Sequence, residues 1–285
     1  MAELTYNQVA KIKVFGVGGA GSNAVNRMVQ EGVQGVEFYI ANTDLQAMDI
    51  SPVANKIQLG KEGLGAGGNP DNGRKAAVES EDAIRKSMEG ADMVFLTAGM
   101  GGGTGTGAAP LFAKIAKELG CLTVGIVTKP FNFEGKRRER NAEQGLEQLK
   151  EYVDSLIIIS NNKVLEVIGH IPFQDAFKEA DNILRQGVQT ITDLIAVPAM
   201  INLDFADIKS VMEGQGSALF GIGMADGDDK AREAAARAIQ SPLLEAQIAG
   251  AKSAIINVTG GTSMSAFDAS EAVDFIREAA GNDID

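Results

Sequence analysis

Three glycine-rich segments of the chain contain residue types suited to binding phosphate. In the densest, GMGGGTGTGA at residues 99–108, glycine fills six of ten positions. Glycine at that density costs conformational entropy on folding, so its position requires a reason. No lysine of the Walker A kind follows it, so backbone N–H groups, a helix dipole, a metal ion and the hydroxyls of Thr104 and Thr106 would have to meet the negative charge. We predict that this loop holds phosphates.

A second segment, GVGGAG at residues 16–21, follows a β-rich run and precedes a helical pattern, as in a dinucleotide-binding fingerprint. Asp44 follows at a spacing that suits a ribose-binding carboxylate. A third segment, GLGAGGNP at residues 63–70, suits either a terminal phosphate or a plain surface loop. Two phosphate turns at one sheet edge favour a nucleoside triphosphate. A nicotinamide-dependent oxidoreductase, which needs one such turn, is the alternative that residues 16–21 and Asp44 leave open.

Two acids, Asp204 and Asp207, lie three residues apart at an expected helix start. On spacing alone they are best interpreted as an N-cap and a first-turn acid, because the helix dipole favours both. The same carboxylates could position a water molecule for attack on a phosphate, and the two roles are compatible.

Short β-rich runs alternate with amphipathic helical patterns over the first half of the chain. The expected strands are 12–17, 36–41, 92–99, 122–128 and 155–160, and the expected helices include 71–89 and 109–120. This alternation predicts a doubly wound, Rossmann-like α/β domain with a parallel sheet, in which ligands bind at the carboxyl ends of the strands.

Apolar residues recur at helical spacing from 173 to 195 and predict one long central helix. After Pro198 the pattern predicts a smaller α+β domain. We therefore divide the chain into a nucleotide-binding domain at 1–172, a connecting helix at 173–197 and a second domain at 198–285.

The composition indicates a globular protein that does not bind nucleic acid, since the net charge is −12 and tryptophan is absent. No apolar stretch has transmembrane length and no signal peptide is present, so we expect a cytoplasmic location without membrane insertion. The single cysteine, Cys121, excludes an intrachain disulfide. The single histidine, His170, has no partner for a His/Cys metal site.

Several motifs occur in a fixed order along the chain: GVGGAGSNAVNRM, NTDLQAM, GLGAGGNP, AGMGGGTGTGAAP, TKPFNFEGKRR and NLDFADIKSVM. Together they resemble the FtsZ family of bacterial tubulin homologues over residues 8–281. The resemblance implies a cytoskeletal GTPase that binds GTP and GDP, assembles head to tail with copies of itself and acts at the division site of the cell.

The resemblance also implies which residues contact the nucleotide. The glycine loops and the NTD turn would surround the phosphates and ribose through Gly18, Gly19, Ala20, Gly21, Asn42, Asp44, Ala66, Gly67, Gly102, Gly103, Thr104, Gly105, Thr106 and Gly107. Glu134 would bind a ribose hydroxyl and Arg138 the polar edge of the nucleotide. From composition alone, these two residues belong to a solvated charged turn.

Asp181 and Phe177 match the family's contacts to the base, and Asn161 matches another contact to the nucleotide. A carboxylate accepts hydrogen bonds from the N1–H and N2–H₂ edge of guanine, whereas adenine presents an acceptor at N1. Asp181 would therefore select GTP over ATP. Without the resemblance, Asp181 is most simply an exposed helical acid.

In the same family, the NLDFAD loop reaches the GTP of the adjoining subunit. Asp204 and Asp207 would polarise or position the attacking water, and Asn202 would help to orient it. Hydrolysis would then depend on stacking of subunits into a filament. We expect Mg²⁺ to bridge the terminal phosphates and assign it no protein side chain.

The chain also departs from the family pattern. The lead into the third glycine loop is shorter and lacks an arginine, and the chain stops before a further pair of strands. The second domain is therefore expected to be incomplete, with an unpaired sheet edge. By the family pattern, we also expect this chain to lack the linker and terminal peptide that recruit division proteins. A GTP-binding structural protein with impaired assembly or hydrolysis is thus the second alternative.

Overall fold

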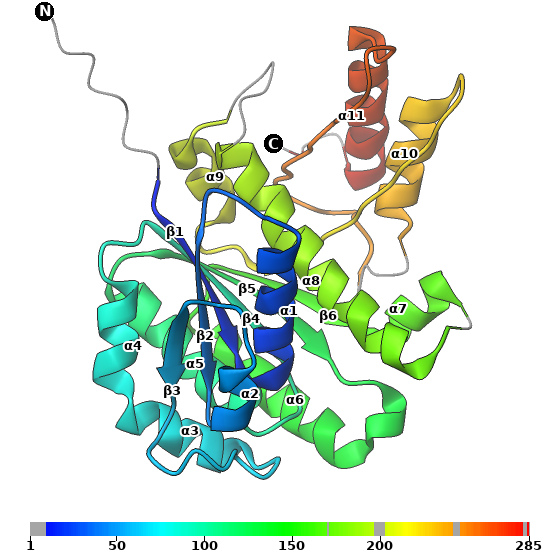
Figure 1. Cartoon of the computed structure of the whole chain (residues 1–285). Coiled ribbons are helices and arrows are strands. Elements are labelled where there is room, and N and C mark those ends of the chain that lie inside the picture. Colours follow the sequence, from blue (N-terminus) through cyan, green and yellow to red (C-terminus); the bar gives the residue numbers. More distant parts are fainter. Residues whose placement is uncertain (1–9, 170, 197–202, 242–245, 282–283, 285) are drawn as a thin grey trace, which may run out of the picture.

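The computed structural model describes residues 10–169, 171–196, 203–241, 246–281 and 284. Its centre is a seven-stranded, all-parallel sheet of order β3-β2-β1-β4-β5-β6-β7 (Figure 1). The strands are β1 (Ile12–Val17), β2 (Glu37–Asn42), β3 (Asn55–Gln58), β4 (Met93–Gly99), β5 (Leu122–Lys129), β6 (Ser155–Ser160) and β7 (Gly216–Ala218). The predicted doubly wound fold is confirmed. The strand order reverses between β1 and β4, the position at which such sheets bind ligands.

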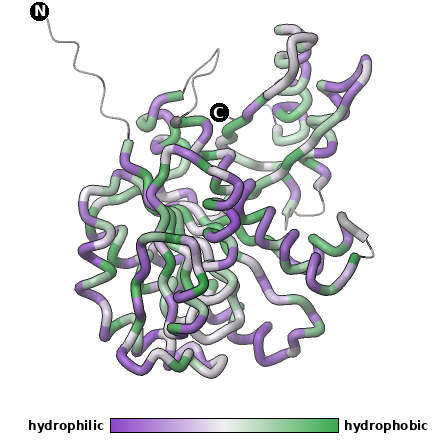
Figure 2. The backbone as a smooth tube through the Cα atoms, in the orientation of Figure 1, coloured by the Kyte–Doolittle hydropathy of each residue, from purple (hydrophilic) through white to green (hydrophobic). Residues whose placement is uncertain are grey.

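Helices cover both faces of the sheet. They are α1 (Gly18–Gln30), α2 (Leu45–Asp49), α3 (Pro70–Glu79), α4 (Glu81–Met88), α5 (Thr104–Glu118), the short 3₁₀ helix η1 (Asn132–Glu134), α6 (Lys136–Lys150), α7 (Asn161–Ile168), α8 (Phe173–Ala196), α9 (Phe205–Met212), α10 (Lys230–Ile239) and α11 (Ala266–Ala280). One core packs the sheet against α3 to α6, and the other packs it against α1, α8 and α9. Because both faces are covered, β1 and β4 are buried along nearly their whole length and are mostly apolar, and Figure 2 shows this hydrophobic centre.

The prediction of a single helix at 71–89 is wrong, because the structure has two helices there, α3 and α4. They are separated at Ser80, whose Oγ donates to the carbonyl oxygen of Gln58 at 3.1 Å and accepts from the N–H of Gly60 at 2.9 Å. A serine that bonds to a neighbouring segment competes with the helical pattern. The amphipathic pattern of the sequence does not reveal this break, because α4 begins at Glu81, directly after Ser80.

The long helix is confirmed as α8, Phe173–Ala196. Its buried stripe includes Ala180, Leu184 and Val188, and it packs on β5 and α1. At 1.5 Å per residue, its 24 residues span about 36 Å. The helix therefore runs along the molecule from the carboxyl edge of the sheet to the amino edge, where α9 follows (Figure 1).

The second domain contributes one strand among the described residues. This strand, β7, pairs with β6 at the end of the main sheet, and its other edge has no strand partner in the described part of the chain. Gly221 and Gly223 lie so close to α10 that a Cβ on either would overlap the helix backbone. This segment is thus packed on a helix, while α10 and α11 contact each other through Ala235 and Ile276. None of the described helices has both the length and the apolar character to cross a membrane.

Candidate functional site

Two helices begin at glycine loops at the carboxyl edge of the sheet, and both leave their first amides without a side-chain cap. Helix α1 follows Val17 and α5 follows Gly103. The neighbouring helices α2 and α3 are capped by the side chains of Asp44 and Asn69. Because free N–H groups and the helix dipole both favour an anion, the ends of α1 and α5 form an anion-binding edge where β1 and β4 meet.

Many glycines of these loops are required by close packing. A Cβ on Gly18, whose φ is +75°, would lie 2.7 Å from the nitrogen of Gly105. A Cβ on Gly103 would lie 2.7 Å from the Cβ of Ala66. Gly21, Gly105 and Gly107 likewise lie against neighbouring backbone. These residues bring the loops and helices α3 and α5 together more closely than any side chain would permit.

Other glycines border open space. Gly19 and Gly102 have no neighbouring atom within 4 Å of the position that a Cβ would occupy, and the same holds for Gly67 and Gly68 in the third loop. Ala20, next to Gly19, is exposed. We call these open positions, which belong to neighbouring loops beside the two free helix ends, the cradle; their exposed backbone is suited to a polyphosphate.

The two threonines of the densest loop form hydrogen bonds within the protein. The Oγ1 atoms of Thr104 and Thr43 lie 2.7 Å apart, and Oγ1 of Thr106 accepts from the N–H of Gly101 at 2.8 Å. Both threonines are buried. Their hydroxyls thus fix the shape of the loop, and a direct bond to phosphate stays a prediction.

The NTD turn and the third loop are joined through their backbones. The N–H of Gly65 donates to the carbonyl oxygen of Thr43 at 3.0 Å, and the N–H of Leu45 donates to that of Gly63 at 3.1 Å. Oδ1 of buried Asn42 accepts from the N–H of Thr43 at 2.9 Å. Because Asp44 caps α2, its carboxylate also has a structural role beside any contact with the nucleotide.

Phe177 and Asp181, which are expected to contact the base, lie in the first half of α8, and Asn161, another expected nucleotide contact, is the first residue of α7. Burial raises the pKa of the Asp181 carboxyl to about 7, although the nearby Arg27 cation opposes that rise. Phe177 belongs to a group of four rings, with centroids 5.0 Å from Phe131 and 5.4 Å from Phe173. Asn161 is buried, and its Oδ1 accepts no hydrogen bond in the described structure. An unpaired buried oxygen and a desolvated carboxylate are both suited to a ligand with N–H donors.

Glu134, the predicted ribose contact, and Arg138, the predicted contact to the polar edge of the nucleotide, bond to each other. Oε2 of Glu134 accepts from Nη1 of Arg138 at 2.7 Å, and Oε1 accepts from the N–H of Phe131 at 2.9 Å. The Glu134 side chain is largely buried, while that of Arg138 is half exposed. A cavity of about 210 Å³ lies beside this turn, at the carboxyl ends of β5 and β6.

The two acids expected to be catalytic form the reciprocal cap of α9. Oδ1 of Asp204 accepts from the N–H of Asp207 at 2.9 Å, and Oδ2 of Asp207 accepts from the N–H of Asp204 at 3.0 Å. The capping interpretation is thus confirmed. Helix α9 lies at the amino edge of the sheet, since Oγ of Ser155, at the start of β6, donates to the carbonyl oxygen of Met212 at 2.7 Å. Asn202 lies outside the described residues.

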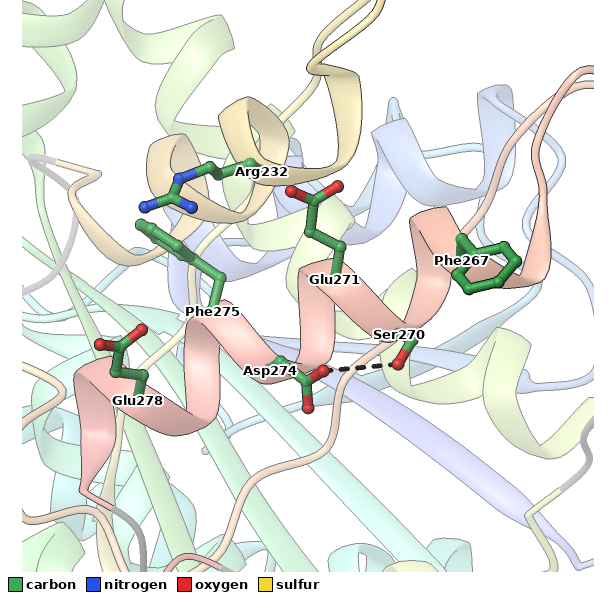
Figure 3. Close-up of a pocket in the computed structure, with 7 residues that line it drawn as sticks. All are labelled: Arg232, Phe267, Ser270, Glu271, Asp274, Phe275 and Glu278. Carbon is green, nitrogen blue, oxygen red and sulfur yellow. Dashed lines mark hydrogen bonds between the residues drawn. The ribbon is translucent and has the colours of Figure 1, made fainter.

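A second cavity, of about 290 Å³, lies far from the glycine loops, between α10 and α11 (Figure 3). Glu271, Asp274 and Glu278 line it, together with Arg232, which lies over the ring of Phe275 at 5.2 Å. Three carboxylates against one cation would repel phosphate. This groove is therefore not the nucleotide site.

Comparison with known proteins shows which nucleotide-binding family this chain belongs to. The model of the Tubulin/FtsZ family GTPase domain matches residues 11–169, and that of the FtsZ family C-terminal domain matches residues 216–285. The chain belongs to the tubulin/FtsZ family. It is thus a GTPase that binds guanine nucleotides, which confirms the predicted activity and removes the oxidoreductase alternative.

Solved structures agree with this assignment. FtsZ of M. jannaschii, solved as an empty dimer, is 43% identical, with a TM-score of 0.92 over 97% of this chain and 84% of that one. CetZ2 of Haloferax volcanii, solved as a GTPγS-bound protofilament, has a TM-score of 0.77 at 19% identity, over 95% of this chain and 86% of that one. CetZ1 of the same organism, a GDP-bound monomer, has a TM-score of 0.81 at 21% identity, over 95% of this chain and 86% of that one. At such identities the CetZ structures show the shared fold alone.

Two features of the site could not be predicted with the motifs. Thr43 bonds to Thr104 across two loops, and nothing in the local sequence predicts that contact. Asn141 donates from α6 to the carbonyl oxygen of Gly101 at 3.2 Å. The available signal for Asn141 is its residue type, because asparagine is a poor helix former inside a helix.

Proposed function

We propose that this GTPase hydrolyses GTP at a site shared between adjacent subunits of a head-to-tail filament that serves cell division. One observation carries the proposal. The glycine loops lie at the carboxyl edge of the sheet, while Asp204 and Asp207 lie at its amino edge, beyond the end of α8, a helix about 36 Å long. No carboxylate can act across that distance, so these acids would serve the nucleotide of another copy.

Such a contact joins two different faces of the same molecule. Repeated without closure, it makes a filament. FtsZ of M. jannaschii, at 43% identity, was solved as a dimer, which supports self-assembly. Hydrolysis at the junction would remove the phosphate that the next subunit contacts, so GDP would weaken the interface that GTP strengthens.

Different residues around the cradle would bind different parts of the nucleotide. The amides around Gly19 and Gly102 would hold phosphates, Phe177 and Asp181 would hold guanine, and Asn161 would make another contact to the nucleotide. Glu134 and Arg138 would exchange their mutual bond for contacts to the ribose and the polar edge of the nucleotide.

Magnesium would be held mainly by the nucleotide. Among the described residues, no group of three His, Cys, Asp or Glu side chains could hold a metal ion. The backbone-lined cradle thus suits a metal that keeps water and phosphate oxygens as its ligands. When bound, Mg²⁺ would neutralise charge on the terminal phosphates.

The division of the chain at 172 and 197, a cytoplasmic location at the division site and contact with other division proteins belong to the same proposal. They are supported by the family assignment and by the two separate family matches at 11–169 and 216–285.

The test is an Asp207→Asn variant, because an amide oxygen can still accept the capping bond from Asp204 while the charge is lost. Phosphate release from GTP should rise steeply above a threshold protein concentration for the unmodified chain and be negligible for the variant. Mixed with the unmodified protein, the variant should lower turnover, since each variant subunit disables its neighbour's GTP. Glu213→Gln at the other end of α9 is the matched control. Unchanged turnover in Asp207→Asn would refute the shared site, and GTP binding without any turnover by the unmodified chain would favour a purely structural role.

A further inference from the structure

The third glycine loop, residues 63–69, is held at both ends. Its start is bonded to the NTD turn through Gly65 and Gly63, and its end is fixed where Asn69 caps α3. Between these ends, Gly67 and Gly68 have φ values of +59° and +67° and border open space. Two consecutive glycines have many accessible conformations, so the apex needs a further contact to keep this one.

Helix α6 provides that contact. Nδ2 of Asn141 lies 3.2 Å from the carbonyl oxygen of Gly101 and 3.5 Å from that of Gly68. Nη2 of Arg137 lies 3.5 Å from the same Gly68 oxygen. One amide group thus spans the densest glycine loop and the apex of the third loop, and we call Asn141 with Arg137 the clasp.

The helix that carries the clasp is closely packed against the rest of the site. A Cβ on Gly145, one turn further along α6, would overlap the side chain of Thr106, so this helix lies directly against the densest loop. Asn141 is half-buried inside α6, where asparagine is less favourable than leucine or glutamine. Helix stability therefore does not explain why position 141 is an asparagine, whereas the contacts of its side chain with two carbonyl oxygens do.

We propose that Asn141, assisted by Arg137, is a positioning residue that holds the Gly67–Gly68 apex against the terminal phosphate of GTP. This inference rests on the proposed function, in which the third loop meets that phosphate. GDP lacks the terminal phosphate. The clasp should therefore matter for binding the triphosphate and not for binding the diphosphate, a difference that a general structural role would not produce.

The test compares equilibrium affinities for GTPγS with Mg²⁺ and for GDP, at protein concentrations below assembly. Asn141→Leu removes both donor contacts and keeps a side chain that branches at Cγ. Its affinity for GTPγS should fall about tenfold, the effect of one or two hydrogen bonds, while its affinity for GDP changes less than about twofold. Asn141→Gln, which keeps the amide donor, should recover part of the loss. Gln144→Leu, the same change at an exposed position of α6, is the matched control and should bind both nucleotides normally.

A thermal midpoint at or above that of the unmodified chain, expected because leucine is the better helix former, shows that Asn141→Leu is folded. Equal losses for GTPγS and GDP, or no loss for either, would overturn the positioning role. Failure of the unmodified chain to bind any guanine nucleotide would refute the proposed function itself, so the two failures are distinguishable.

Discussion

Neutralising the Asp181 side chain should stabilise the nucleotide-free fold and, at the same time, remove the preference for GTP over ATP. Burial raises the pKa of its carboxyl to about 7, against an ordinary value of about 3.9. A difference of about three pKa units corresponds to about 4 kcal/mol, and solvent relaxation at a half-buried site reduces that to about 2 kcal/mol. Without nucleotide, the ionised carboxylate therefore destabilises the fold.

The sign follows from proton linkage. The folded chain holds the Asp181 proton more tightly than the unfolded chain, so this group's favourable contribution is complete below about pH 4 and is lost as pH rises to about 7. Asp181→Asn removes the charge. The variant without nucleotide should be more stable than the unmodified chain by about 2 kcal/mol at pH 8, with the gain shrinking toward zero near pH 4.

Urea unfolding of nucleotide-free protein at pH 5 and pH 8 measures this gain. Glu179→Gln, a neutralised acid two residues away on α8, is the control and should show no comparable gain at pH 8. The same Asp181→Asn protein should lose its preference for GTP over ATP, because an amide places donors against the guanine N–H groups. A variant without added stability at pH 8, or with a gain independent of pH, would refute the desolvation argument.

Other predictions concern the same site. GTP affinity of the unmodified chain should fall by up to about tenfold per pH unit below pH 7, because guanine requires the Asp181 carboxylate; titrations at pH 6 and pH 8 check this. Gly103→Ala should destabilise the chain by about 1–3 kcal/mol in urea unfolding through overlap with Ala66. Gly102→Ala should leave stability unchanged within about 0.5 kcal/mol and weaken GTP binding. Asp204→Ser should keep the α9 cap, seen as an unchanged midpoint, and lose turnover in the phosphate-release assay.

The fold was largely predictable because alternating apolar strands and amphipathic helices follow directly from burial on both faces of a parallel sheet. The limits of α8 and the cap at Asp204 were also predictable, since both are local patterns. The break at Ser80 was not, because it depends on a bond to Gln58, which is distant in sequence. The absence of strand beyond β7 in the described residues was missed for a similar reason, as strands require partners and the pattern of one segment does not show whether it has one.

The glycines of this site have two different structural roles, and the sequence does not distinguish between them. Density alone located the loops for which we predict phosphate binding, because so much lost entropy requires a reason. It could not separate the two reasons that the structure shows. Gly103 and Gly107 make room for Ala66 and for the backbone of α3, whereas Gly102, between Gly101 and Gly103 in sequence, borders open space. Both kinds are needed together, since the close approach of α3 and α5 is what places the open positions of three loops around one cradle. The distinction depends on which backbone passes each Cα, and that is a property of the folded chain rather than of any motif.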